Sequence, residues 1–304
     1  MGGVHFGLER IPSLSRSGVG RAEELRSDHD ALRAGWAGAL LLYVDRTGRF
    51  RATAEGALDF AEPSSAEPEP GAVFMGTRDG RHVWAARRPA LSGDLADLMS
   101  VGAALSDDDA GLVTGAVAVL GWHDRARYSA LDGSETEPSL SGWSRISATS
   151  GHEEFPRTDP AVICLVHDGA DRVLLARQPT WPQRRFSVLA GFVEAGESLE
   201  ACVAREIAEE VGVTVHDIRY LGSQPWPFPR SVMIAFAAVG DPSQPLRFQD
   251  GEIAEAAWFT RDEVRRALGS GDWASSADAP LLLPGSISIA RVMLESWASE
   301  SVAD

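Results

Sequence analysis

The clearest pattern of hydrophobic and polar positions in the chain surrounds one acidic segment. Residues 186–193 (FSVLAGFV) are apolar and rich in strand-forming types, and residues 194–196 (EAG) are typical of a turn. From Ser198 onward, hydrophobic residues recur at three- and four-residue steps. This spacing predicts a helix that begins after Ser198, a favourable N-cap residue, and ends at Gly212.

Comparable patterns predict most other elements. Strand pairs are expected around turns at residues 45–48, 79–80 and 168–169, the last between AVICLV and RVLLAR. Helices are expected at residues 21–35, after Thr260, and at about residues 286–299. Strands mixed with helices from residue 159 predict an α/β fold, namely an α/β/α sandwich around a mixed sheet, preceded by a smaller α/β domain. We expect three parts, residues 1–115, 116–158 and 159–304, and no internal repeat.

Three glutamates of the predicted acidic helix pose an electrostatic problem. Glu206, Glu209 and Glu210 are spaced i, i+3 and i+4, so they share one helix face. Carboxylates this close raise each other's pKa unless a cation lies among them. Mg²⁺ or Mn²⁺ would meet that need and would also bind phosphate oxygens. The alternative is a solvated acidic helix face.

A solvated acidic helix face would explain the three glutamates, but it would not explain the other residues at fixed positions around them. The segment fits the spacing G-x5-E-x7-R-E-U-x-E-E-x-G-U, in which U is a bulky aliphatic residue. The fixed positions are Gly191, Glu197, Arg205, Glu206, Ile207, Glu209, Glu210, Gly212 and Val213. So many specified positions make a chance match improbable. This spacing resembles the Nudix box of enzymes that cleave a phosphoanhydride in nucleoside diphosphates linked to another group.

A second motif lies ten residues after the box. Residues 223–231 read SQPWPFPRS, and the alternating prolines predict an extended loop that is neither helix nor interior strand. The rings of Trp226 and Phe228 could stack on a flat nucleotide base, and such rigid side chains lose little entropy on binding. A proline-rich linker is the alternative, but the motif runs directly into the apolar strand SVMIAFAAVG.

Together the two motifs make the chain, from about Trp122 to its C-terminus, similar to NADH pyrophosphatases of the NudC type. The resemblance implies an enzyme that hydrolyses NAD(H) to NMN(H) and AMP, works as a homodimer, and also removes NAD caps from RNA 5′ ends. A non-catalytic Nudix-fold nucleotide sensor is the alternative. Such sensors typically lose box glutamates or add a helix-turn-helix, so the complete box favours the enzyme.

The resemblance also implies a role for each matched residue. Glu206, Glu209, Glu210 and Glu252 would hold two or three Mg²⁺ or Mn²⁺ ions, and Glu252 is preferred over the nearby Glu255. One of the box glutamates, with Glu210 preferred, would double as the general base. Glu197 lies in the predicted loop, where it would pair with Arg205 and fix the helix against that loop. The base pocket would contain Phe192, Ala190, Gln224, Trp226, Ser231, Met233 and Ala290.

The region before the box departs from the family pattern. The resemblance implies a degenerate Nudix-like N-terminal domain and then a four-cysteine zinc ribbon between Trp122-His123 and Phe155-Pro156. The ligand positions here are Ser129, Asp132, Ser147 and Ser150. Because serine is not a structural zinc ligand, we expect no structural zinc. Packing and hydrogen bonds would hold this connection instead.

The composition of the chain limits its expected cellular location and binding partners. The 304-residue chain has a net charge of −16 and no lysine, so we do not expect general nucleic-acid binding, although a local arginine patch would still admit an RNA end. No signal peptide or membrane span is apparent. The two cysteines, Cys164 and Cys202, fall at apolar positions, so we expect no disulfide and a cytoplasmic location.

Overall fold

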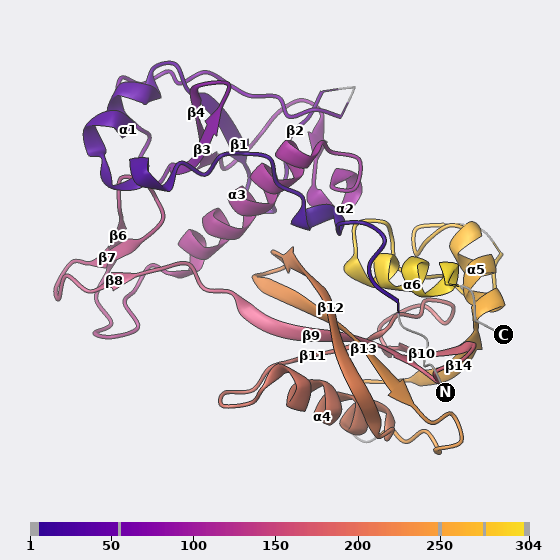
Figure 1. Cartoon of the computed structure of the whole chain (residues 1–304). Coiled ribbons are helices and arrows are strands. Elements are labelled where there is room, and N and C mark those ends of the chain that lie inside the picture. Colours follow the sequence, from indigo (N-terminus) through magenta and orange to yellow (C-terminus); the bar gives the residue numbers. More distant parts are fainter. Residues whose placement is uncertain (1–5, 54–55, 249–250, 276–277, 301–304) are drawn as a thin grey trace. The chain divides into compact units, whose positions relative to one another are not determined.

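The chain forms two compact units. The computed structural model describes residues 6–53, 56–248, 251–275 and 278–300. One unit, here the C-terminal unit, combines Met1–Ser13, Asp159–Gln224 and Ser231–Asp304. The other, the N-terminal unit, combines Leu14–Thr158 with Pro225–Arg230. Figure 1 labels their helices and strands. The division into three parts at residues 115 and 158 stays a prediction.

The C-terminal unit is built on a six-stranded mixed sheet. Its order is β12-β13-β9-β10-β14, and β11 also pairs with β9. β9 pairs in parallel with β13 and antiparallel with β10 and β11. The strands are β9 (Asp159–His167), β10 (Arg172–Arg177), β11 (Leu189–Phe192), β12 (Val215–Trp226), β13 (Ser231–Gly240) and β14 (Glu255–Thr260). β9 is an almost continuous apolar run because both of its faces are covered.

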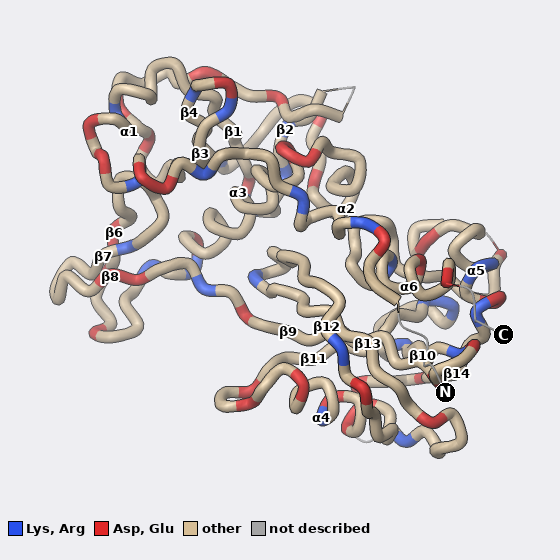
Figure 2. Tube along the Cα trace, viewed as in Figure 1, with Lys and Arg blue, Asp and Glu red and all other residues tan. Residues whose placement is uncertain are grey.

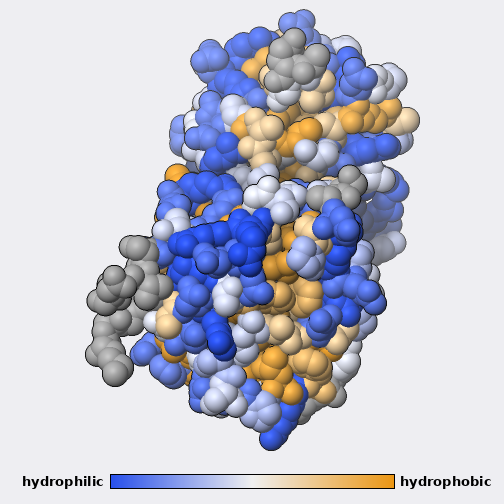
Figure 3. All heavy atoms as spheres, turned by 90° about the vertical axis from the view of Figure 1, so that its right-hand side faces the viewer, coloured by the Kyte–Doolittle hydropathy of each residue, from blue (hydrophilic) through white to orange (hydrophobic). Residues whose placement is uncertain are grey.

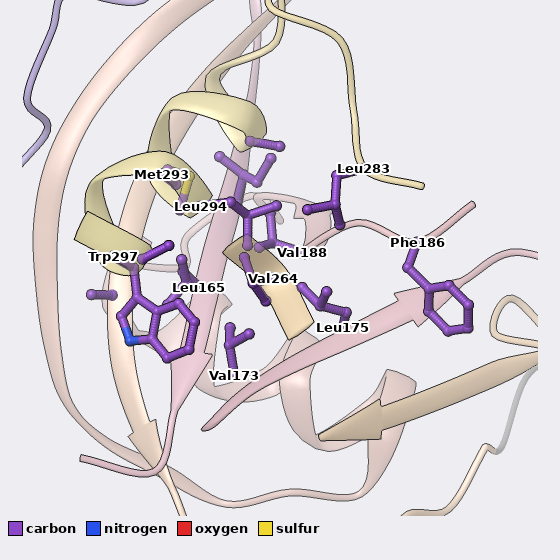
Figure 4. Close-up of a cluster of buried hydrophobic side chains, with 14 of the residues drawn as sticks. Leu165, Val173, Leu175, Phe186, Val188, Val264, Leu283, Met293, Leu294 and Trp297 are labelled. Carbon is purple, nitrogen blue, oxygen red and sulfur yellow. The ribbon is translucent and has the colours of Figure 1, made fainter. Parts of the chain in front are cut away.

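Helices cover both faces of this sheet. On one face, α4 (Leu199–Val211) packs on Val162, Cys164 and Val166 of β9. On the other, α5 (Arg261–Gly269) and α6 (Ile289–Ser299) pack on Ile163 and Leu165. Figure 4 shows this second core, in which Trp297, Met293 and Leu294 of α6 approach Leu165. The predicted α/β/α sandwich is therefore confirmed, because alternate residues of β9 serve two separate cores.

The N-terminal unit contains a five-stranded sheet with helices. The sheet order is β3-β4-β1-β2-β5, and the predicted turns at residues 45–48 and 79–80 join β1 to β2 and β3 to β4. The strands are β1 (Leu40–Val44), β2 (Phe50–Arg51), β3 (Val73–Arg78), β4 (Arg81–Arg87) and β5 (Leu95–Ala96). The helices are η1 (Ser13–Ser15), η2 (Glu23–Ser27), α1 (His29–Trp36), α2 (Leu98–Val101) and α3 (Asp107–Arg125).

Two predictions about this unit need correction. The helix expected at residues 21–35 is interrupted, because the side chain of Asp28 caps a new helix by accepting a hydrogen bond from the N–H of Ala31 (2.9 Å). The long helix α3 was not predicted. Its signals were Ser106, which caps it, and three aspartates in its first turn, where the helix dipole favours negative charge.

A small antiparallel sheet follows α3. It consists of β6 (Thr136–Pro138), β7 (Arg145–Ser147) and β8 (Glu153–Glu154). These strands occupy the region in which the sequence retains the outline of a zinc ribbon.

The proline-rich motif is only partly a loop. Its first residues, including Pro225, belong to β12, which extends to Trp226. The prediction of a loop was wrong for this part. β12 lies at the edge of the sheet, where a residue without an N–H donor is tolerated. Within the described residues, no helix has the combined length and apolarity needed to cross a lipid bilayer.

Hydrophobic side chains also reach the surface. Figure 3 shows them in orange among larger hydrophilic areas on one side of the molecule.

Candidate active site

Helix α4 presents the glutamates of the box from a firmly anchored frame. The hydroxyl of Ser198 accepts a hydrogen bond from the N–H of Ala201 (3.2 Å), and Gly212 ends the helix with a φ of 75°. Cys202 and Ile207 are buried against the sheet. Figure 2 shows several acidic residues in red along α4. The predicted helix and both of its ends are confirmed.

Arg205 is the centre of the site's hydrogen-bond network. Its Nε and Nη2 bind the two carboxylate oxygens of Glu197 at 2.8 and 2.9 Å, a bidentate geometry. Its Nη1 lies 2.9 Å from Oε1 of Glu206 and 2.9 Å from Oε2 of Glu209. Nη2 also donates to the carbonyl oxygen of Phe192 at 3.0 Å. One guanidinium thus joins the loop, the helix and the end of β11.

Glu197 is held ionised by this network. The guanidinium of Arg205 lowers the pKa of Glu197 to about 2, and the N–H of Glu194 contributes through a 3.1 Å hydrogen bond. The same pairing raises the pKa of Arg205. The loop connection that the sequence predicted is present, as a charged link between residues eight positions apart.

The carboxylate of Glu206 lies directly against the backbone of Gly191. A Cβ atom added to Gly191 would lie only 1.9 Å from Cδ of Glu206, so no side chain fits at this position. Burial raises the pKa of Glu206, and the nearby charges of Glu209 and Glu252 raise it further, although Arg205 opposes them. Glu206 is thus crowded by negative charge, which a cation would relieve.

The other acidic residues differ in exposure. Glu209 is exposed, whereas Glu210 is buried, with 4% of its surface accessible. Glu252 is exposed and its charge acts on Glu206. Glu255 instead lies in β14, where its carboxylate is 3.4 Å from Nε of Arg177. This arrangement favours Glu252 over Glu255 as the additional acidic residue.

The acidic side chains of the site offer the type of ligand atom that a hard divalent cation prefers. Glu206, Glu209, Glu210 and Glu252 supply only carboxylate oxygens, the ligands that Mg²⁺ and Mn²⁺ prefer. Among the described residues, no three acidic, histidine or cysteine side chains already surround a common point. Arg205 contacts one carboxylate oxygen of Glu206 and one of Glu209, so coordination by both would use the second oxygen of each.

Two predicted base-pocket residues share one row of the sheet. Phe192 of β11 and Met233 of β13 both pair with Ala161, one on each side of β9. Residues paired in this way lie on the same face, here the face covered by α6. Phe192 is 59% exposed, so its ring is available to a ligand. Ala190 lies one row further, opposite Ile163, and is also exposed.

The remaining predicted residues of the C-terminal unit are buried. Gln224 is completely inaccessible, and its side-chain nitrogen donates to the carbonyl oxygen of Ile287 at 3.0 Å. It therefore holds the segment that leads into α6, on which Ala290 lies. Ser231 and Ala290 are 7% and 1% exposed. These contacts point to a positioning role for Gln224.

The aromatic residues of the second motif belong to the N-terminal unit. The rings of Trp226 and Phe228 contact each other edge to face, with centroids 5.1 Å apart and an interplanar angle of 75°. This pair forms a rigid aromatic corner. A role for Trp226 in base binding stays a prediction.

Hydrogen bonds join three of the four zinc-ribbon positions, Asp132, Ser147 and Ser150. The carboxylate of Asp132 accepts from the hydroxyls of Ser134 (2.6 Å), Ser147 (2.8 Å) and Ser150. It also accepts from the N–H of Ser134 (2.9 Å). These donors lower the pKa of Asp132, the Ser134 hydroxyl most strongly. Hydroxyls and one carboxylate do not form a structural zinc site, so the residues present do not fit that metal.

This region contains a short repeat that was not predicted. Residues 127–133 read RYSALDG and residues 145–151 read RISATSG, so the expectation of no internal repeat was wrong at this scale. In both copies, the final glycine has a positive φ, 71° at Gly133 and 69° at Gly151. Its N–H donates to the carbonyl oxygen of the repeat's serine, at 2.9 and 3.1 Å. The two loops therefore have the same backbone construction.

Comparison with known proteins decides the family. The NUDIX domain model matches residues 157–278. The "NAD-capped RNA hydrolase NudC" of Mycobacterium bovis (strain BCG / Pasteur 1173P2) is 57% identical over 310 residues, which cover 98% of each chain. This chain belongs to the Nudix hydrolases, in the NudC-type NADH pyrophosphatase family.

Other similar proteins cover less of the chain. The "NAD(P)H pyrophosphatase NUDT13, mitochondrial" of Mus musculus is 42% identical over 198 residues, which are 64% of this chain and 56% of that protein. Among solved structures, a NUDIX hydrolase from Nitrosomonas europaea covers 45% of this chain and 78% of its own, with 21% identity and a TM-score of 0.39.

Proposed function

We propose that this protein hydrolyses the pyrophosphate of NAD(H) to NMN(H) and AMP. The observation that carries the proposal is the Arg205 network, which joins Glu197, Glu206 and Glu209 to the backbone carbonyl of Phe192 at the end of β11. One face of α4 would handle the charged diphosphate. The row of Phe192 and Met233 would receive a flat base. The names of the relatives support this substrate class.

The reaction breaks one phosphoanhydride bond and consumes one water molecule. The water oxygen forms a bond to one phosphorus as the bridging oxygen leaves, and the water gives up a proton to a base. We assign that base to Glu210, because its carboxylate is the most buried on the acidic face of α4. Positioning and charge stabilisation would supply most of the rate enhancement.

A divalent cation would complete the site. We assign its ligands to Glu206, Glu209, Glu210 and Glu252, in accord with the general use of divalent ions by Nudix hydrolases. When bound, such an ion neutralises diphosphate charge and lowers the pKa of water. The crowding of negative charge at Glu206 supports Mg²⁺ or Mn²⁺ at this place.

Removal of an NAD cap from RNA is the second activity we propose. It uses the same bond cleavage on a substrate whose adenosine continues into an RNA chain. The name of the 57% identical relatives, "NAD-capped RNA hydrolase NudC", favours it. We further propose a cytoplasmic homodimer. Two free, buried cysteines support a reducing compartment.

The test is incubation with NADH in Mn²⁺ and then in Mg²⁺, with the products separated by chromatography. We expect equal amounts of NMNH and AMP. Parallel incubation with NAD-capped and uncapped RNA would reveal decapping by release of NMN. Intact NADH with both metals, from a protein that binds the dinucleotide, would contradict the proposed activity and favour a nucleotide sensor.

A further inference from the structure

The two copies of the repeat place an arginine at the same position of each loop. These arginines, Arg127 and Arg145, line one cavity of about 240 Å³ in the N-terminal unit. Arg87 of β4 lines it as well, together with His123 and the carboxylates of Asp124 and Glu69. We call this cavity the arginine pocket. Three arginines around so small a space are unexpected in a chain with a net charge of −16.

The two carboxylates in the arginine pocket are already paired. Asp124 accepts from Nη2 of Arg87 at 2.8 Å. Glu69 is 3.1 Å from Nη2 of Arg88 and also accepts from a tyrosine hydroxyl. Among the described residues, neither Arg127 nor Arg145 has a carboxylate within salt-bridge distance. Arg127 and Arg145 therefore bring two positive charges to the pocket that none of its lining carboxylates pairs directly.

Two arginines of the pocket, Arg87 and Arg145, are half-buried. Burial lowers the pKa of Arg145, and the like charge of Arg127 lowers it further, while the carboxylate of Glu137 acts in the opposite direction. Burial also lowers the pKa of Arg87, whose Nε is inaccessible and has no hydrogen-bond partner among the described residues. An anion in the pocket would relieve the repulsion between the arginines.

Neighbouring groups hold Arg145 in place without neutralising it. Its Nε and Nη2 donate to the hydroxyl and carbonyl oxygens of Thr136, at 2.7 and 2.5 Å. Its Nη1 lies 3.1 Å from Nδ1 of His123, whose Nε2 is 2.7 Å from the carbonyl oxygen of Gly142. Burial lowers the pKa of His123, which favours the neutral ring that accepts from Arg145. The guanidinium is thus preorganised, at little entropic cost to a ligand.

We propose that the arginine pocket binds a phosphate-type oxyanion, either of a small polyphosphate or of an RNA backbone. Its volume lies below the roughly 300–1,000 Å³ typical of sites for drug-sized ligands, which suits phosphate groups rather than a base with its sugar. Planar guanidinium groups match the geometry of phosphate oxygens. The proposal does not depend on the hydrolysis proposed above, because no residue of the pocket belongs to α4 or its acidic face.

Two arginines near each other in the chain provide a matched pair of variants. Arg127→Gln removes an exposed charge that lines the pocket. Arg125→Gln removes an exposed charge two residues earlier, whose Nη1 donates to the carbonyl oxygen of Gly121 and which does not line the pocket. Both variants change the net charge equally. Neither touches the proposed active site, so NADH turnover should stay unchanged and report that both are folded.

The experiment is a calorimetric titration of the full-length chain with inorganic pyrophosphate, without added metal. We expect saturable binding that weakens about tenfold in Arg127→Gln, as loss of a charge-assisted hydrogen bond implies, and little in Arg125→Gln. A second titration uses an uncapped oligoribonucleotide. Binding that pyrophosphate displaces would identify an RNA phosphate as the ligand, and binding of pyrophosphate alone would identify a small anion. Absence of saturable binding of both probes, or equal weakening by both variants, would overturn the proposal.

Discussion

Two polar networks in this molecule are each organised by one charged side chain, and the two centres have opposite signs. In the C-terminal unit, the guanidinium of Arg205 donates to three glutamates. In the N-terminal unit, the carboxylate of Asp132 accepts from three serines. Both networks join a loop to a neighbouring segment of the chain, and both use charge-assisted hydrogen bonds.

The two networks differ in the net charge that remains after the hydrogen-bonded groups are paired. Arg205 neutralises only one of its three glutamates, and Glu252 adds further negative charge near Glu206. That excess makes the α4 network a place for a cation. Around Asp132 the partners are neutral hydroxyls, so one ionised carboxylate accepts hydrogen bonds from all three serines and no second charge is needed. The first network is therefore unsaturated and suited to catalysis, whereas the second is complete and suited to structure.

The largest effect should follow from the buried glutamate of the catalytic network. Glu210→Gln removes the base and a metal ligand while keeping the volume of the side chain. We expect kcat with NADH to fall by about 10²- to 10⁴-fold, the range for loss of general acid–base catalysis. Glu200→Gln is the control, because Glu200 is an exposed residue in the first turn of the same helix. Substantial activity in Glu210→Gln would remove Glu210 from the mechanism.

A smaller loss should follow from changing the backbone that supports Glu206. In Gly191→Ala, the new Cβ would lie 1.9 Å from Cδ of Glu206, so the carboxylate must move. A displacement of this size near reacting groups can cost about 10²-fold in rate. The matched control is Gly269→Ala, because a Cβ there meets no atom within 4 Å. Steady-state kinetics should separate the two, and equal activity would show that the position of Glu206 is unimportant.

The catalytic network could be predicted from sequence much more fully than the structural one. Periodicity located α4, and the spacing of Gly191, Glu197 and Arg205 anticipated the link between loop and helix. No local pattern reveals that Glu210 is buried while Glu209 is exposed, because this depends on how α4 packs on the sheet. Pairing across β9, which brings Phe192 and Met233 into one row, is likewise a property of tertiary structure.

For the region of the Asp132 network, only the absence of the zinc-binding cysteines was predicted from sequence. The serines were predicted not to hold zinc, but the hydrogen bonds of Ser147 and Ser150 to Asp132 were not predicted. The clue was the repeat of R-x-S-A with a glycine three residues later, a signal of two equivalent turns. α3 was missed for a similar reason, since many alanines and glycines weaken its amphipathic pattern.

Removing the charge of Asp132 should destabilise the N-terminal unit without affecting catalysis directly. Asp132→Asn keeps the shape but leaves the serine hydroxyls with a weaker acceptor, so we expect thermal unfolding at lower temperature. The folded-state pKa is depressed, so the stabilisation is present above the unfolded pKa of about 3.9 and is lost as pH falls below it. The difference in melting temperature between wild type and variant should therefore be constant from pH 7 to about pH 4 and narrow as the pH falls to 3. A difference that stays constant down to pH 3 would show that the ionised carboxylate is not the source.

The smallest effect on activity should follow from replacing the hydrogen bonds of the Asp132 network with a bound metal ion. This change also tests most directly whether that network is purely structural. The variant with cysteine at positions 129, 132, 147 and 150 offers four thiols from two loops of the same backbone construction. We expect it to bind one Zn²⁺ per chain in tetrahedral geometry and to be destabilised by chelators, whereas the wild-type protein is not. NADH turnover should change little in the zinc-loaded form, because α4 is untouched. Zinc content by mass spectrometry and melting with and without chelator would measure this. A variant that folds but takes up no zinc would show that the loops do not converge as the Asp132 network indicates.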